Sequence, residues 1–136
     1  MASNLEDDAK QQIAALKDQL RARDEFISKI FELAPIGVVC NDMADGRFVV
    51  TNPAFLEIIG RTPEELAALS RWEVTPQKYE ADEADKIEQL KKTGKYGPYE
   101  KEYILRDGST VFARLIGEVV KSPDGNETLL SFIETI

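Results

Sequence analysis

The chain has 136 residues, enough for one domain with a hydrophobic core of ordinary size, and 25 acidic against 17 basic residues give it a net charge of -8. This charge disfavours binding to nucleic acid or to anionic lipid, because both depend on basic side chains that neutralise phosphate. The absence of histidine and the presence of one cysteine, Cys40, exclude a Ser-His-Asp or Cys-His catalytic site, a histidine-ligated haem and an internal disulfide.

Residues 5–33 are predicted to form one long helix, because apolar or small side chains recur at alternating steps of three and four residues, with Arg23 as the one interruption. This spacing is typical of the seam of a coiled coil, so we expect the helix to pair with its counterpart in a homodimer. The alternative is an amphipathic helix that packs on its own domain. Pro35 ends the helix, since its ring disfavours helical geometry at the preceding residue, and this divides the chain into a helix over 1–34 and a domain over 35–136. The candidate dimer contacts are Ile13, Leu16, Leu20, Ile27 and Ile30.

Two short strands are expected next, over residues 36–40 and 47–51, in an antiparallel hairpin with a turn-rich connection that ends in Asp-Gly. The stretch NPAFLEIIGRTPEEL then changes to helical spacing. Asn52 and Thr62 are predicted to cap two short helices, each with proline at its first position, and Gly60 ends the first of them.

A further helix is expected after Thr75, which we predict to be its cap because a proline follows at the first helical position. Gly94 and then Gly97, with the proline after it, close this region. The helix carries an acidic run over residues 80–85. Since a calcium loop needs turn geometry with a central glycine, we interpret this run as a solvated helix face.

The last part of the chain is expected to consist of strands, over residues 99–105, 110–120 and 129–133, with turns at 107–108 and 123–126. Five strands joined in this way predict an α+β fold with an antiparallel sheet. The helices between the second and third strands can cover only one face of that sheet. The N-terminal helix or a second subunit is the candidate cover for the other face.

Four stretches in order, ELAPIGVV, NPAFLEIIGRTPEEL, YGPYEKEYILRDGSTVFARL and FIETI, give residues 32–136 a resemblance to the PAS domain. The resemblance implies a five-stranded antiparallel sheet with short helices on one face, enclosing a small cavity. It also implies a sensory or dimerising role in a signal-transduction protein, such as a histidine kinase of a two-component system or a diguanylate cyclase. In such proteins an N-terminal helix often pairs in a dimer.

The end of the chain bears on what this module would control. The family commonly ends its last strand with Asp-Ile-Thr, ahead of a linker and an output domain. Here Glu134-Thr135-Ile136 stands at that place and the chain stops. We therefore expect the C-terminal output domain to be absent from this chain, as in an excised piece of a longer protein.

The known cofactors of the family can be compared with the residues present. Members that form a flavin-cysteine adduct carry their cysteine in an Asn-Cys-Arg-Phe-Leu-Gln motif on the helical flank, whereas Cys40 falls in the first expected strand and is interpreted as a small buried hydrophobic residue. Haem-binding members mostly use an axial histidine, and this sequence has none. Met43 could ligate haem iron in principle, but it falls in a turn, where a surface or packing role is favoured. Neither haem nor covalent flavin is expected. Non-covalent flavin stays an alternative, and the cofactor is otherwise unknown.

With haem and covalent flavin excluded, the cavity is expected to hold a small organic ligand or no ligand. Trp72 is expected either to form a wall of the pocket, with its N–H toward a ligand, or to be a core or lid residue. Arg114 shares a strand face with Phe112 and Ile116. If this face points into the cavity, Arg114 would anchor a ligand carboxylate. If it points outward, which we favour, Arg114 would be a solvated or interface charge. The candidate ligand-binding residues are Val38, Cys40, Phe55, Ile59, Trp72, Tyr79, Ile87, Tyr103, Arg114, Ile116 and Phe132.

The predicted function is a regulatory sensor that binds a small ligand and relays the signal through its terminal helix and last strand. The alternative is a ligand-free homodimerisation scaffold whose cavity is filled by its own side chains. An enzyme is not expected, because no nucleophile-base pair, metal-ligand set or spaced carboxylate pair stands out. No membrane insertion is expected, since no apolar run approaches the length of about 20 residues that spans a bilayer. With no secretion signal and a single cysteine, the expected location is the cytoplasm.

Overall fold

The long N-terminal helix is present in the computed structural model, which describes residues 2–136. It runs from Ala2 to Leu33 as α1, so it begins three residues before the predicted start and ends at the residue expected from Pro35. Residues 2–33 and 34–136 form two separate compact units. The five candidate dimer contacts on α1 are exposed, as are the larger part of its other apolar side chains.

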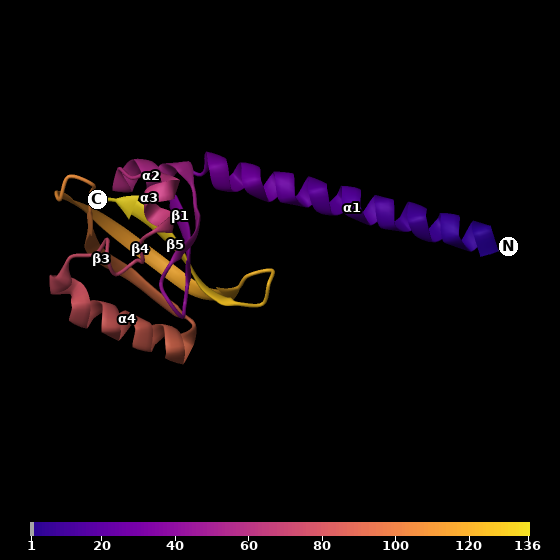
Figure 1. Ribbon diagram of the computed structural model, residues 1–136. Coiled ribbons are helices and arrows are strands. Elements are labelled where there is room, and N and C mark those ends of the chain that lie inside the picture. Colours follow the sequence, from indigo (N-terminus) through magenta and orange to yellow (C-terminus); the bar gives the residue numbers. More distant parts are fainter. Residues whose placement is uncertain (1) are drawn as a thin grey trace. The chain divides into compact units, whose positions relative to one another are not determined.

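The second unit is built on a five-stranded antiparallel sheet, as predicted (Figure 1). Its strands are β1 (Gly37–Asp42), β2 (Phe48–Thr51), β3 (Lys95–Ile104), β4 (Thr110–Lys121) and β5 (Glu127–Thr135). They lie in the order β2-β1-β5-β4-β3, so that the first and last strands of the unit pair at its centre. This arrangement makes β1 the link between the N-terminal hairpin and the three C-terminal strands.

Both short helices begin where their capping residues predicted, and the first also ends at the predicted glycine. Asn52 precedes α2 (Pro53–Ile59) and its side chain accepts a hydrogen bond from the backbone N–H of Phe55, while Gly60 ends the helix in a left-handed conformation. Thr62 caps α3 (Pro63–Ala67) in the same way. Asn52 also accepts from the Val38 N–H at 2.8 Å, so one side chain joins α2 to β1.

Two expectations for the following segment were wrong. Thr75 does not cap a helix: a single 3₁₀ turn, η1 (Gln77–Tyr79), separates it from α4 (Glu80–Thr93), and neither element has a side-chain cap. Gly97 does not close the helical region but lies in a bulge inside β3, which begins at Lys95. Both residues were interpreted from local turn preferences, which tertiary contacts override here.

The core lies on the sheet face that α2, α3 and α4 cover. Val39, Leu115 and Ile133 from the sheet are buried there with Phe55 and Ile59 of α2. The opposite face carries exposed apolar side chains, among them Val50, Phe112, Ile116 and Phe132, and no other element of residues 34–136 covers them. We call this surface the outer sheet face.

Candidate functional site

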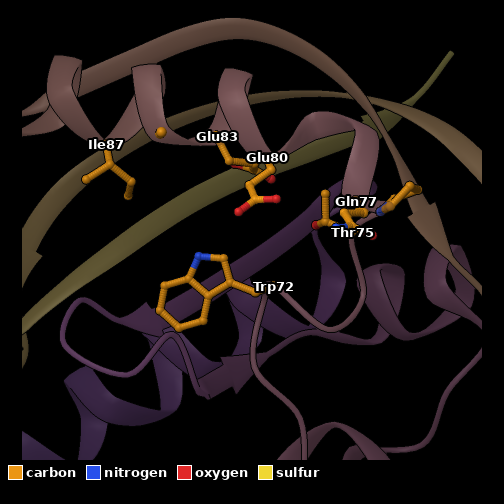
Figure 2. A pocket seen from close by; sticks show the side chains of 8 residues that line it. Trp72, Thr75, Gln77, Glu80, Glu83 and Ile87 are labelled. Carbon is orange, nitrogen blue, oxygen red and sulfur yellow. The ribbon is translucent and has the colours of Figure 1, made fainter.

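One opening beside the core lies between α4 and the loop that precedes it, which holds Trp72. We call it the outer pocket; its volume is about 440 Å³. Figure 2 shows the Trp72 ring facing α4 across this space, with its indole nitrogen on the side nearer the helix. The labelled lining residues are Trp72, Thr75, Gln77, Glu80, Glu83 and Ile87.

Trp72 owes its position to the turn between β1 and β2. Gly46 in that turn has a φ of 71°, and a Cβ atom there would overlap the indole ring. The carbonyl of Gly46 also accepts a hydrogen bond from the Arg71 N–H at 2.9 Å and another from the Asn41 side chain at 3.1 Å. The loop that forms one wall of the outer pocket is thus fixed to the first hairpin by backbone contacts.

A second space lies deeper, between the sheet and α4, and we call it the inner cavity. It measures about 20 Å³, room for about one water molecule. Its apolar wall belongs to the core, and its polar wall comes from β1, β3, β5, α4 and the Trp72 loop. The residues of that polar wall include Asn41, Arg71, Glu83, Tyr96, Lys101 and Ser131.

Three charged side chains meet at the inner cavity: Arg71, Glu83 and Lys101, here called the buried ion cluster. The Lys101 ammonium donates to Glu83 Oε1 at 2.6 Å and to Thr75 Oγ1 at 2.9 Å. Arg71 Nη1 lies 3.9 Å from Glu83 Oε2. The exposed fractions of the three side chains are only 11% for Arg71, 13% for Glu83 and 5% for Lys101.

The buried ion cluster carries one more positive charge than negative charge, because two cations share a single carboxylate. Burial lowers the pKa of Lys101, and the neighbouring Glu83 carboxylate opposes that change. The Arg71 guanidinium stacks on Trp72, with its carbon 4.8 Å from the ring centre. Over residues 2–136 we find no hydrogen bond that this guanidinium donates, so its donors are available to an acceptor placed in the inner cavity.

Tyrosines of β3 surround the buried ion cluster. The Tyr96 hydroxyl lies 3.2 Å from Ser131 Oγ, and burial raises the pKa of the Tyr96 phenol. The Tyr99 hydroxyl is buried with no hydrogen-bond partner in the described part of the chain. The Lys101 ammonium lies 4.8 Å from the centre of the Tyr103 ring. The site is therefore a polar, cationic centre within an aromatic shell.

Six of the eleven candidate ligand-binding residues lie on the helical side of the sheet. Phe55 and Ile59 are fully buried in the core and line neither space, whereas Tyr103 lines the inner cavity. Trp72 and Ile87 line the outer pocket. The sixth is Tyr79, whose hydroxyl donates to Glu102 at 2.7 Å; burial, together with this contact, raises the pKa of Tyr79 to about 12.

The other five candidates line neither space. Alternation along β1 places Val39 and Asn41 inside and Val38 and Cys40 on the opposite side, so the expected inward orientation of the last two was wrong by one residue. Ile116 and Phe132 are half-exposed on the outer sheet face, also against expectation. Arg114 lies on that face, the orientation favoured from the sequence, where it pairs with Glu100 at 3.0 Å and with Glu134 at 3.5 Å.

The sequence interpretation missed all three members of the buried ion cluster. Glu83 was placed with its acidic neighbours on a solvated face, which is right for Glu80 and Asp82 but not for Glu83. The sequence did contain one indication of the cluster. Lys101 alternates with Tyr99 and Tyr103 along the strand, so a charged side chain lies on the same face as two large aromatic side chains that are buried.

Two further searches of the described residues, 2–136, gave no candidate. In this range no three side chains of cysteine, aspartate or glutamate gather in a way that could hold a metal ion. No helix in the same range is long and apolar enough to cross a membrane.

Comparison with known families gives one match that covers most of the chain. The sequence model described as PAS domain matches residues 35–136. Among curated proteins the chain is similar to the sensor histidine kinase TmoS of Ectopseudomonas mendocina, with 30% identity over 121 residues. That match covers 86% of this chain but 12% of the length of the kinase.

Three solved structures share the fold of the chain, and two of them are described as PAS domains. The PAS domain of a protein from Colwellia psychrerythraea has a TM-score of 0.72 at 14% identity, covering 82% of this chain and 95% of that one. The PAS domain of an HTR-like protein from Haloarcula marismortui has a TM-score of 0.71 at 23% identity, covering 90% and 99%. A domain of the sensory box sensor histidine kinase/response regulator from Geobacter sulfurreducens has a TM-score of 0.65 at 25% identity, covering 85% and 96%.

Proposed function

Because the chain belongs to the PAS family over residues 35–136, we propose that it is a sensory module of a histidine-kinase-type signalling protein and that it binds a small ligand between α4 and the sheet. The buried ion cluster is the observation that carries this proposal. Charges buried in a small core stabilise a fold weakly or not at all, since their desolvation offsets their attraction. A cluster of this kind beside an open pocket is better explained by ligand recognition than by stability.

The signal would leave the site through the elements that hold it. Glu83 is on α4, Lys101 is on β3, and Ser131 of the inner cavity is on β5, next to β1 at the centre of the sheet. A ligand that rearranges the buried ion cluster would shift α4 against β3, and the sheet would carry that change to β5 and to the N-terminal helix. Such a ligand must bind the two arrangements with different affinities.

A thermal-shift screen of the full chain against a metabolite collection tests ligand binding. Native mass spectrometry of the purified chain, which detects a retained small molecule, accompanies it. We expect at least one compound that raises the melting temperature, and we expect the gain to shrink when Lys101 is replaced by Met. A complete screen with no stabilising compound and no retained mass would contradict the ligand-binding part of the proposal.

One observation favours a second function, a ligand-free dimerisation scaffold. The side chains around the inner cavity leave only about 20 Å³ of it empty. In this second reading, the outer sheet face and the exposed apolar side chains of α1 would serve assembly with a second copy. The metabolite screen distinguishes the two functions, because a scaffold requires no ligand.

Dimerisation through α1 belongs to both readings and has its own test. Leu20 is exposed and lies near the middle of the predicted seam. We expect Leu20→Asp to reduce the dimer fraction in sedimentation, because a carboxylate in an apolar seam loses its hydration, while the circular dichroism of the sheet stays unchanged. The matched control is Ala14→Asp, which introduces the same single charge on the solvated side of the helix, outside the seam. An unchanged dimer in the Leu20 variant would contradict the coiled-coil prediction.

A further inference from the structure

The charge imbalance of the buried ion cluster points to the chemical class of the ligand. Arg71 and Lys101 share one carboxylate, that of Glu83, which leaves one positive charge in excess beside the inner cavity. We propose that the ligand is a small organic monocarboxylate, and that Glu83 occupies the position of the ligand carboxylate in the unliganded protein. This inference rests on the ligand-binding function proposed above and names its ligand class.

Arg71 supplies the recognition group. Its guanidinium is almost buried, has an ion-pair distance of 3.9 Å to Glu83 and donates no hydrogen bond over residues 2–136. A planar guanidinium binds a carboxylate through two parallel hydrogen bonds, a geometry that Glu83 does not reach at this distance. A ligand carboxylate between Arg71 and Lys101 would satisfy these donors and supply the negative charge that Glu83 takes away when it moves out.

Glu83 separates the two spaces and so controls entry. It lines both the outer pocket and the inner cavity. When its side chain turns outward into the outer pocket, the two spaces join, and a ligand carboxylate can take its place against Lys101. The apolar part of the ligand would then lie in the outer pocket against Trp72, Ala84 and Ile87.

The rim of the outer pocket limits the ligand to one acidic group. Glu80, in the first turn of α4, lines that pocket near Trp72 and is exposed (Figure 2). A second carboxylate on the ligand would meet this like charge, together with the displaced Glu83. The site therefore favours a monocarboxylic acid with an apolar body over a dicarboxylic acid.

An organic amine fits the same residues poorly. Arg71 already stacks on the Trp72 ring, so one face that could hold a ligand cation carries a cation of the protein. Glu83 is likewise already paired with Lys101 at 2.6 Å. An ammonium group brought to the inner cavity would add to an excess of positive charge.

Glu83 acts in this scheme as an internal competitor of the ligand carboxylate, so its removal should raise the affinity for the ligand. Removal of a contact residue normally weakens binding, whereas Glu83→Gln removes the competing carboxylate and should strengthen it. If the outward arrangement of Glu83 is populated at about 10% or less in the free protein, the variant binds about 10-fold tighter or more.

The experiment measures binding of sodium benzoate and sodium butyrate to the full chain, by calorimetry and by the fluorescence of Trp72, the one tryptophan of the sequence. Benzamide and butyramide are the neutral probes, and butylamine is the cationic probe. The proteins are wild type, Glu83→Gln, Arg71→Gln and the control Glu88→Gln, which removes an exposed carboxylate of α4 that lines neither space. Circular dichroism verifies that each variant is folded; Arg71→Gln keeps the Lys101–Glu83 pair and leaves the buried ion cluster neutral.

We expect a carboxylate probe to bind Glu83→Gln about 10-fold tighter than wild type, and to bind Arg71→Gln about 10-fold more weakly or more, the loss typical of a hydrogen-bonded charge pair. Glu88→Gln should bind like wild type. Equal binding of the amides, or tighter binding of butylamine, would overturn the carboxylate assignment and leave the ligand-binding function standing. Failure of both carboxylates to bind Glu83→Gln would also overturn the assignment. The metabolite screen then decides separately whether a ligand of another class exists.

Discussion

Replacement of Glu83 by Gln tests whether the buried ion cluster is held together by a single carboxylate. The substitution keeps the size and shape of the side chain and leaves an amide oxygen as an acceptor for Lys101. Among residues 2–136, it removes the one carboxylate that pairs with Arg71 and Lys101. Lys101 and Arg71 then face each other across the inner cavity with no counter-ion from the protein.

The distances give the size of the effect. At an effective dielectric constant of about 20, the charge pairs at 2.6 Å and 3.9 Å attract by about 6 and about 4 kcal/mol. The cost of desolvating the three groups offsets much of this attraction, and removal of one partner from a buried pair lowers stability by about 3–5 kcal/mol. Because the amide oxygen still accepts from Lys101, we expect Glu83→Gln to lower the free energy of unfolding by about 3 kcal/mol.

The stability of Lys101→Met is to be compared with that of Glu83→Gln. The Lys101 substitution removes the most deeply buried charge, leaves Arg71 paired with Glu83, and replaces the lysine stem with an apolar side chain of similar length. Because this variant leaves no uncompensated charge, we expect it to change stability by about 1 kcal/mol or less. The double variant should be more stable than Glu83→Gln alone, since one of the two unpaired cations is gone.

Urea unfolding at neutral pH, followed by circular dichroism and by Trp72 fluorescence, measures all three variants with Glu80→Gln as the exposed control. Equal losses for Glu83→Gln and Glu80→Gln would refute the reasoning, because they would mean that the buried carboxylate matters no more than the exposed one. A loss for Lys101→Met as large as that for Glu83→Gln would refute the claim that excess positive charge is the cause. Addition of benzoate to Glu83→Gln should restore part of the lost stability, since a ligand that binds only the native state stabilises it.

Three other predictions concern the frame around the site. Hydrogen bonds from Lys78, Tyr79 and a threonine hold the pKa of Glu102 at about 2, against an ordinary value of 4.5. The stability that comes from this lowered pKa is present above pH 4.5 and is lost as the pH falls toward 2. Glu102→Gln removes this contribution, so the midpoint of urea unfolding should fall less steeply with decreasing pH than in wild type. Asn52→Ala should lower stability by about 3 kcal/mol in urea unfolding, because it strands two buried N–H groups, whereas Asn52→Asp, which keeps both acceptor contacts, should lose less. Gly117→Ala should cost about 1–3 kcal/mol in the same assay, because its Cβ would overlap the Tyr96 ring; an unchanged midpoint would mean that the ring has room to move.

Local signals were sufficient for the elements whose ends depend on neighbouring residues. Asn52 with its proline, Gly60, and Thr62 with its proline each bring their own capping hydrogen bond or backbone conformation, so the starts of both short helices and the end of the first could be predicted. Thr75 has the same local pattern but a different role. Its hydroxyl donates to the carbonyl of Arg71 and accepts from Lys101, 26 residues away in the chain, and no local preference carries that information.

The sequence by itself determined the strands, the helices, their order and hence the family, because turn chemistry and apolar periodicity act over a few residues. Only the tertiary structure decided which face of β1 points inward. The residues before Cys40 form a continuous apolar run, so no alternation of apolar and polar residues shows which side chains face the core. The buried ion cluster also depended on the fold. Arg71, Glu83 and Lys101 come from a loop, a helix and a strand, and each resembles a solvated charge until packing removes the water around all three. Burial and pairing are properties of the assembled fold, and for this reason Glu83, which the sequence pattern assigned to a solvated helix face, lies in the candidate site.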